Sequence, residues 1–305
     1  VGSVSNSGLE LTIDTKNIQT KEFSWTSSFN ISFNRNKVLS LNDDEPSLAS
    51  RVNWGNFNNA YPYIAIPGHP IAMFYGHIFD GVYQYTDFDK VGESYILKDG
   101  VPNNGNAREK IQPGDIKFKD INRDGVVNDY DLTIIGNPNP KHIGGFGNNF
   151  QYKNFDLNVF FQWSYGGDVL NANRIEFEGG DPNARTSLNM FASFANRWTP
   201  ENQTNELYRI GGQGPAVYSS RTIEDGSFLR LKTVSLGYRL PNAWLKKINI
   251  KSLRVYASAQ NLITWTRYSG PDPEVSTRPT ALTPSFDWSP YPRPRTLTLG
   301  VDISF

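Results

Sequence analysis

Apolar side chains recur at every second position in several windows of this chain, and this period of two constrains the fold more than any other feature. Between Phe155 and Tyr165 every odd position is apolar or aromatic, whereas Asp156 and Gln162 are among the even ones. A strand places successive side chains on opposite faces, so the pattern predicts strands with one apolar and one polar face. The windows are 9–15, 23–34, 155–165 and 297–305, and, less regularly, 144–152, 228–239 and 251–263.

The alternation changes phase inside the window 228–239. Leu229 and Leu231 occupy odd positions, whereas Val234 and Leu236 occupy even ones. One extra residue in the strand would return the apolar side chains to a common face. The sequence therefore predicts a β-bulge near Lys232–Thr233.

Two kinds of fold explain the alternation: a soluble β-sandwich with one buried face, and a membrane β-barrel whose apolar face contacts lipid. Hydrophobic residues make up only 38% of the chain although aromatic residues reach 13%, and no apolar run is long enough for a helical span. A tilted strand crosses the hydrocarbon layer with roughly 9–11 residues, which the window 155–165 provides with aromatic residues at both ends. We interpret the fold as all-β, a transmembrane antiparallel β-barrel, with the sandwich as the alternative.

The connections between the windows differ in length. The segments 16–20, 153–154 and 241–249 are short, whereas other connections are long, polar and rich in Gly, Asn and Pro. Outer-membrane barrels have short periplasmic turns and long extracellular loops. We therefore expect long extracellular loops at about 35–70, 87–142, 166–227 and 266–294.

The expected number of strands indicates whether the chain could form a closed barrel by itself. If the last residue is placed in the periplasm, the segment 34–142 begins and ends outside and must contain an even number of crossings, to which residues 71–85 could contribute part of a hairpin. The total is then odd, about nine strands, whereas a bacterial single-chain barrel has an even number. The sequence therefore predicts the C-terminal portion of a larger barrel.

Several segments resemble one protein family. The chain ends in TLTLGVDISF, which resembles the terminal strand of outer-membrane barrels. Three further segments are similar to the SusC/RagA branch of the TonB-dependent transporters: PIAMFYGHIFDGVYQ, GDIKFKDINRDGVVNDYDLTIIGNPNPKHIGGFGNNFQYKNFDLNVFFQWSYGGDV and FLRLKTVSLGYRLPNAWLKKINIKSLRVYASAQNLITWT. Together the similar segments cover nearly the whole chain.

The resemblance implies a barrel of about 22 strands, closed by an N-terminal plug, of which this chain would supply part. It also implies a SusD-like surface lipoprotein as a lid, contact with outer-membrane lipid, and TonB-driven import of oligosaccharides, peptides or similar nutrients into a Gram-negative bacterium. No plug or TonB-contacting segment is recognisable here, so TonB would act through the absent N-terminal part, and this chain would pair with the rest of the same barrel. A structural or adhesin-type outer-membrane barrel without transport is the alternative.

An acidic segment at residues 120–131 has the ligand spacing of an EF-hand calcium loop. Oxygen-bearing side chains stand at loop positions 1, 3, 5, 9 and 12, a glycine stands at 6, and position 7 would offer its main-chain carbonyl. The candidate ligands are Asp120, Asn122, Asp124, Val126, Asn128 and Asp131. Asp131 replaces the usual bidentate Glu, which lowers the expected affinity. A hydrated turn rich in Asp and Asn is the alternative.

Several function classes find no support. The 30 basic residues are balanced by 30 acidic ones, which argues against nucleic-acid binding, and without cysteine there is no thiol nucleophile or thiolate metal site. The three histidines lack metal-site spacing, and no G-x-S-x-G motif occurs. Glu176 and Glu178 could form a catalytic pair, but a solvated loop explains them better. We expect no enzyme activity and no catalytic or cofactor-binding residue.

Aromatic residues in the long connections offer a weaker signal. If exposed, they could stack on sugars or meet a lid protein, whereas packing of the loops against one another explains any single one of them better. The set is Trp54, Phe57, Tyr61, Tyr63, Trp265, Tyr268, Phe286, Trp288 and Tyr291. The substrate-binding residues stay unknown at this stage.

Overall fold

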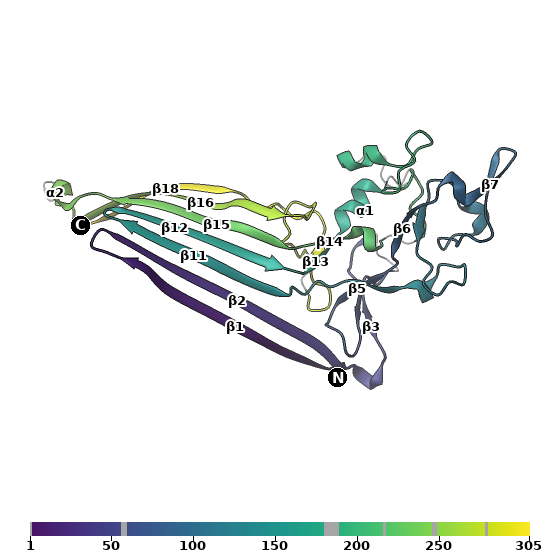
Figure 1. Cartoon of the computed structure of the whole chain (residues 1–305), viewed down its shortest axis with the longest axis horizontal. Helices are drawn as coiled ribbons and strands as arrows, with labels where there is room; N and C mark the ends of the chain where they lie inside the picture. The colour runs from purple at the N-terminus through teal and green to yellow at the C-terminus, as the bar shows by residue number, and fades with distance from the viewer. Residues whose placement is uncertain (1, 56–59, 180–188, 216–217, 246–248, 278–279) are drawn as a thin grey trace.

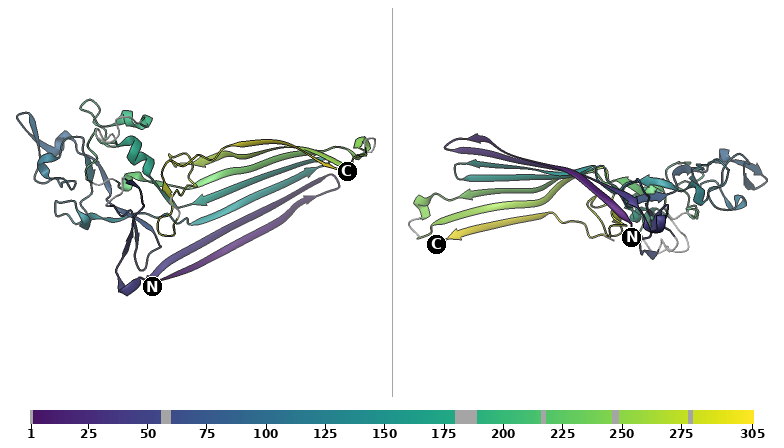
Figure 2. Two further views of the ribbon diagram at one scale, coloured as in Figure 1. Left: turned by 180° about the vertical axis from the view of Figure 1, so that it is seen from behind. Right: turned by 90° about the horizontal axis from the view of Figure 1, so that it is seen from below.

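The computed structural model describes residues 2–305 apart from 56–59, 180–188, 216–217, 246–248 and 278–279. Its main element is a seven-stranded antiparallel sheet that extends as one layer to one side of a region of loops and short elements (Figures 1 and 2). In sheet order the strands are β1 (Ser3–Gln19), β2 (Phe23–Ser40), β11 (His142–Tyr152), β12 (Phe155–Tyr165), β15 (Phe228–Arg239), β16 (Ser252–Thr266) and β18 (Thr296–Ser304). The strands of this sheet therefore follow one another in chain order, interrupted by long excursions.

All seven predicted windows are strands of this sheet, and two of them, β12 and β15, begin and end where the alternation does. The first two strands are longer than their windows, with 17 residues in β1 and 18 in β2. Their pairing continues to Ser3 and Ser40, beyond the apolar part of the hairpin and toward the loop region. The apolar pattern therefore marks the central part of each of these two strands but not its ends.

The register gives the sheet one apolar and one polar face. One row across the apolar face consists of Ile13, Phe29, Phe146, Phe161, Leu231 and Ile263. A row across the opposite face consists of Thr26, Asn149, Asn158, Ser235, Ser258 and Thr298. The two-faced sheet predicted from the period of two is confirmed.

The predicted bulge is also present. Phe160 pairs with Thr233 and Phe161 with Leu231, so Lys232 has no partner on β12. The extra residue lets Val234 return to the apolar face, in the same row as Val159 on the neighbouring strand. The phase change in the sequence thus keeps one face continuously apolar.

The apolar face of the sheet is uncovered. Leu297 and Leu299 on β18 are 79% and 86% exposed, and Leu9 on β1 is 67% exposed. The clusters of buried hydrophobic residues found in the described ranges all lie in the loop region, outside this sheet. Within those ranges no second sheet covers the apolar face, which argues against the β-sandwich. An apolar face of this size is the arrangement of a barrel wall that contacts lipid.

Short and long connections lie at opposite ends of the sheet (Figure 1). The β1–β2 and β11–β12 turns, the helix α2 (Asn242–Leu245) and the C-terminus lie at one end, and the long connections lie at the other. This is the predicted asymmetry between turns and loops.

The long connections contain the smaller sheets. One has four strands, β3 (Leu48–Ser50), β4 (Tyr63–Ala65), β5 (Met73–Gly76) and β10 (Thr133–Gly136), and another has β13 (Asp168–Asn171), β14 (Ile223–Asp225) and β17 (Phe286–Asp287). Two strand pairs add β6 (Phe79–Val82) with β9 (Ile116–Phe118), and β7 (Phe88–Val91) with β8 (Ser94–Leu97). The second long connection also contains the helix α1 (Ala172–Glu178).

The expected crossings within residues 71–85 are therefore wrong. This segment forms β5 and β6, which pair with other short strands of the loop region and not with the large sheet. Each has only four residues, too few to cross a bilayer. Across the described ranges the large sheet has seven strands instead of about nine.

The loops have a hydrophobic core of their own. Its main cluster joins Trp54, Tyr63 and Phe74 from the first long connection to Leu170 from the second and Phe286 from the third. Three connections far apart in the sequence are thus packed into one body. In the described part of the chain, no helix is both long and apolar enough to cross a membrane.

Candidate functional site

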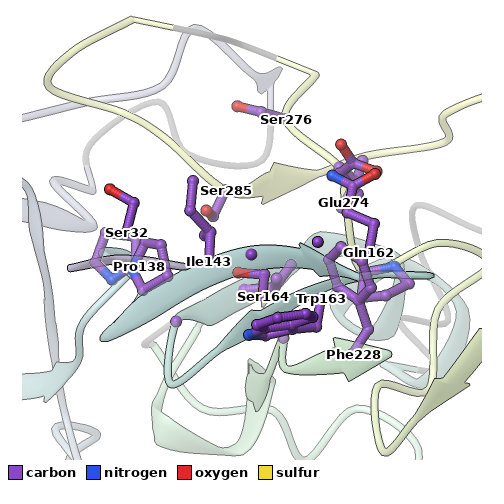
Figure 3. Close-up of a pocket in the computed structure, with 18 of the residues that line it drawn as sticks. Ser32, Pro138, Ile143, Gln162, Trp163, Ser164, Phe228, Glu274, Ser276 and Ser285 are labelled. Carbon is purple, nitrogen blue, oxygen red and sulfur yellow. The ribbon is translucent and has the colours of Figure 1, made fainter. Parts of the chain in front are cut away.

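The loops close over the polar face of the large sheet at its loop end and leave a cavity of about 650 Å³. In Figure 3, Ser276 and Ser285 lie on the loop side of this cavity, and Gln162 and Ser164 lie on the sheet side. A volume of this size is typical of small-molecule sites. The cavity is therefore the first candidate for a binding site.

A glycine gives the floor of the cavity its shape. Gly145 pairs with Asn30 on one side and Gln162 on the other, and all three belong to the polar face. A Cβ atom at Gly145 would lie 2.9 Å from Cζ of Phe160 and 3.2 Å from Nδ2 of Asn30. The absence of a side chain at Gly145 therefore lets an aromatic ring lie against the backbone beside polar amides.

The bulge brings a cation to this floor. Lys232 lines the cavity, and its Nζ donates a hydrogen bond to Oε1 of Gln162. The other charged residues that line the cavity are Asp168 and Glu274. The cavity thus combines both signs of charge with amide, hydroxyl and aromatic groups.

A buried ion cluster ties the roof of the cavity to its floor. Arg230 on β15 is 1% exposed, and its guanidinium lies 2.6 Å from Oδ1 of Asp272 and 3.4 Å from Oε2 of Glu274. Arg293 contacts the same two carboxylates at 3.5 and 2.9 Å. Arg230 therefore ties the connection between β16 and β18 to the sheet, and Arg293, which belongs to that connection, shares its two carboxylates. This connection carries part of the cavity lining.

A second buried contact holds the same connection. The hydroxyl of Tyr268 donates to Oδ2 of Asp287, and main-chain N–H of Ser289 donates to Oδ1 of Asn173 at 2.8 Å. Burial is the main cause that raises the pKa of both Asp287 and Tyr268. Polar contacts thus hold both ends of the connection, a buried one between Tyr268 and Asp287 and a partly buried one between Ser289 and Asn173.

The sequence led us to expect Glu176 and Glu178 in a solvated loop, and this expectation is wrong. They belong to α1 and are 2% and 5% exposed. Oε2 of Glu178 lies 3.0 Å from Nε of Arg174 and 2.6 Å from Nη1 of Arg221. Burial alone would raise the pKa of Glu178, but the two arginines outweigh it and lower that pKa. Ion pairing explains why this carboxylate is buried; the i,i+4 spacing of Arg174 and Glu178 was a signal in the sequence, whereas the contact with Arg221 was not.

Most of the loop aromatics pack the loops against one another. Trp54, Tyr63, Tyr268 and Phe286 are buried, and the Trp54 ring centroid lies 4.8 Å from that of Trp288. Tyr61, Trp265 and Tyr291 are exposed, and Phe57 lies outside the described residues. The packing explanation thus holds for the buried members of this set.

The acidic loop forms a turn around its own carboxylates. Oδ1 of Asp120 accepts the N–H of Arg123 at 2.6 Å, and Oδ2 accepts that of Gly125 at 2.8 Å. Asp131 is 0% exposed and accepts the N–H of Asn128 at 2.9 Å. The first and last predicted ligands therefore both fold back onto the main chain of this loop.

The middle of the loop is held by its side chains as well. Nδ2 of Asn122 donates to Oδ2 of Asp124 at 2.9 Å, and the N–H of Val126 donates to Oδ1 of Asp124 at 2.8 Å. Gly125 has a φ of 83°, which favours glycine, as its place in the calcium-loop pattern requires. Among the described residues, no three His, Cys, Asp or Glu side chains are grouped to hold a metal ion. Calcium binding by this loop stays a prediction.

The cavity itself was missed by the sequence interpretation, which used Lys232 only to place the bulge. A signal was present, because Arg230 and Lys232 are two cations close together in a strand that otherwise reads as membrane-spanning. Charges at such positions are costly unless they serve a purpose on the polar side. The partners of Arg230 lie 42 and 44 positions further along the chain, which no local pattern reveals.

Comparison with known proteins finds relatives along the whole chain. TonB-dependent receptor P3 of Formosa agariphila is 35% identical over 310 residues, covering 100% of this chain and 29% of the relative. TonB-dependent receptor SusC of Bacteroides thetaiotaomicron is 29% identical over 313 residues, covering 100% of this chain and 27% of the relative. No protein-family model matches the chain.

Solved structures give the same result. The chain matches one described as the structure of the RagAB peptide transporter with a TM-score of 0.73 and 26% identity, covering 100% of this chain and 30% of that one. It also matches the RagAB peptide importer in the open-open state with a TM-score of 0.72 and 25% identity, again over 100% of this chain and 29% of the other. The chain therefore spans about three tenths of the proteins it matches.

Proposed function

Since the chain is homologous over its whole length to part of the TonB-dependent receptors that include SusC, we propose that it forms one wall of an outer-membrane transporter that imports nutrients. The observation that carries the proposal is the two-faced sheet. Its apolar face suits lipid, and its polar face carries a cavity under the loops. The cell outer membrane of a Gram-negative bacterium is the corresponding location, with several strands crossing it.

The proposed mechanism is gated passage without covalent chemistry. The polar face lines the lumen, and the loops at the far end of the sheet lie outside the cell and meet the nutrient first. The remainder of the barrel, with a plug, closes the lumen, and TonB acts on that part. Oligosaccharides, peptides or similar nutrients are the proposed cargo, and the similar RagAB protein is a peptide transporter.

A surface lipoprotein similar to SusD is the proposed lid. The similarity to SusC and to the RagAB peptide transporter supports such a partner here. The loop region is large and has its own packed core, as a docking platform for another protein requires. Outer-membrane lipid is the proposed neighbour of the apolar face.

Growth measurements test the proposed import. Cells that lack the protein carrying this chain should lose growth on one oligomeric nutrient from a panel of glycans and peptides, yet grow normally on its monomers. Deletion of tonB should give the same loss on that nutrient. A structural or adhesin-type barrel would instead change attachment or envelope integrity and leave growth on every member of the panel intact.

We also propose that the loop 120–131 binds Ca²⁺ and that the ion stiffens an extracellular loop. The donor set fits this ion: the side chains of Asp120, Asn122, Asp124, Asn128 and Asp131 and the main-chain carbonyl of Val126 supply oxygen ligands. The turn and the positive φ of Gly125 support the proposal. The carboxylates already accept main-chain N–H groups, so ligation would use their remaining lone pairs.

Calorimetry on the whole protein tests this site. Titration of Ca²⁺ into EDTA-treated protein should release heat with a dissociation constant of about 10⁻⁵ to 10⁻³ M. Asp120→Asn combined with Asp131→Asn should abolish the heat, because two anionic ligands are lost. Asp129→Asn, a neutralisation in the same loop at a position outside the ligand pattern, is the matched control and should bind as before. No heat with the unaltered protein would reject calcium binding.

A further inference from the structure

We propose that the cavity over the polar face is a subsite for an anionic group, a carboxylate or sulfate ester, carried by an oligosaccharide, and that Lys232 is the residue that binds it. The inference rests on the proposed import function, because a nutrient must enter the lumen to reach this cavity. It goes further by assigning a chemical class of cargo and a contacting residue.

The charged residues that line the cavity differ in whether they have ionic partners. Of the charged residues lining it, Glu274 is held by Arg230 at 3.4 Å and Arg293 at 2.9 Å. Asp168 accepts the main-chain N–H of Asn137 at 2.7 Å, and burial raises the pKa of this carboxyl above its usual value. Among the described residues that line the cavity, Lys232 is the one cation, and neither Lys232 nor Asp168 forms an ion pair.

The ammonium group of Lys232 has hydrogen-bond donors that the described residues do not use. Its ammonium has three N–H donors, and the one partner that the described residues offer is the neutral Oε1 of Gln162. A partly buried ammonium with one neutral acceptor keeps donors free for a ligand. An anionic oxygen would form charge-assisted hydrogen bonds there, which are about twice as strong as neutral ones.

The bulge explains why this lysine can serve the cavity. Lys232 has no partner on β12, so its backbone is outside the regular ladder. Its insertion places one more side chain on the polar face while Leu231 and Val234 remain on the apolar face. Bulges commonly redirect a side chain at functional sites.

The remaining lining favours a sugar as the carrier of the anion. Phe160 offers a ring surface, and Asn30, Ser32 and Ser164 offer amide and hydroxyl groups. A pyranose ring has apolar C–H faces and a rim of hydroxyls, which suits this mixture. An acidic peptide shares the anionic group but not the rim of hydroxyls, and it serves as a separate arm of the test.

The test measures binding by the purified full-length protein that contains this chain, in detergent and without TonB. The probes are trigalacturonate, a neutral galactose trisaccharide, and an acidic tripeptide with blocked ends. We expect trigalacturonate to bind more tightly than the neutral sugar, and Lys232→Met to weaken it about ten- to a hundredfold while leaving the neutral sugar unchanged. Lys232→Arg should restore much of the preference.

Lys21→Met, at the exposed β1–β2 turn, is the matched control and should change neither affinity. Equal binding of acidic and neutral sugars, or an unchanged affinity in Lys232→Met, would overturn the proposal. Tighter binding of the peptide than of trigalacturonate would overturn the choice of a sugar. Because this binding needs no TonB, growth that persists after tonB deletion counts against the proposed import alone, and an unaltered protein that does not prefer the acidic sugar counts against the subsite alone.

Discussion

Replacing Arg230 by methionine should release the connection between β16 and β18 from the sheet. The change leaves the carboxylate of Asp272, which is 7% exposed, without its closest cation, and leaves Glu274 to Arg293 alone. Removing one partner of a buried ion pair typically costs about 3–5 kcal/mol because the other charge stays buried. Hydrogen exchange of the full-length protein in nanodiscs should show loss of protection over residues 267–277, with a lower unfolding temperature.

Arg254→Met is the matched control for this prediction. Arg254 also pairs with two carboxylates, those of Asp156 at 2.6 Å and Asp302 at 3.2 Å, but those partners are 40% and 63% exposed. Its loss should cost about 1 kcal/mol or less and leave the roof of the cavity protected. Adding Asp272→Asn to Arg230→Met should recover part of the lost stability. Unchanged exchange over 267–277 in Arg230→Met would show that the ion cluster does not hold the roof.

A charge introduced on the apolar face should lower the free energy of unfolding far more than the same charge introduced one residue away, on the polar face. Val159 and Asn158 are adjacent near the middle of β12 and lie on opposite faces of the sheet. Val159→Arg should destabilise the protein in phospholipid vesicles by about 2–4 kcal/mol, the cost of a cation facing lipid near the bilayer midplane. Asn158→Arg should cost about 1 kcal/mol, since it removes one hydrogen bond to Asn149.

The comparison of these two variants distinguishes lipid from a protein layer. Denaturant unfolding from vesicles measures the free energy of unfolding of each variant. The difference between the two variants should persist in vesicles with a thicker hydrocarbon layer. In zwitterionic micelles both variants should still fold if the barrel is intact. Equal costs for Val159→Arg and Asn158→Arg would mean that lipid does not contact the apolar face.

The large sheet was predictable from the sequence because each strand has one face toward lipid and the other toward water. Lipid and water select alternate residues, so the pattern in β12 and β15 ends where the strand ends. The change of phase at Lys232 was readable for the same reason, since a bulge is needed to keep both selections satisfied. Local periodicity carries this information without any distant contact.

The loop region was predicted less well because its residues are selected by contacts with distant segments. Residues 71–85 have an apolar pattern like that of a hairpin, but Phe74 is buried against Leu170 and Phe286 and not in lipid. Glu178 has one ion-pair partner, Arg174, four positions before it, but the other, Arg221, lies 43 positions away, and no local pattern shows that contact. The cavity likewise combines Asn30, Gln162 and Glu274, which only the fold brings together.

The shared core of the three long connections has a thermodynamic consequence for ligand capture. Because Trp54, Leu170 and Phe286 pack together, the loops beside the cavity have a core of their own, and under the proposed import function a cargo molecule would meet loops that are already packed. A cargo molecule then immobilises few further residues, so association should proceed without the slow ordering step of coupled folding. Its heat-capacity change should correspond only to the area that the cargo itself covers, and be far smaller than that of a disordered loop closing over it.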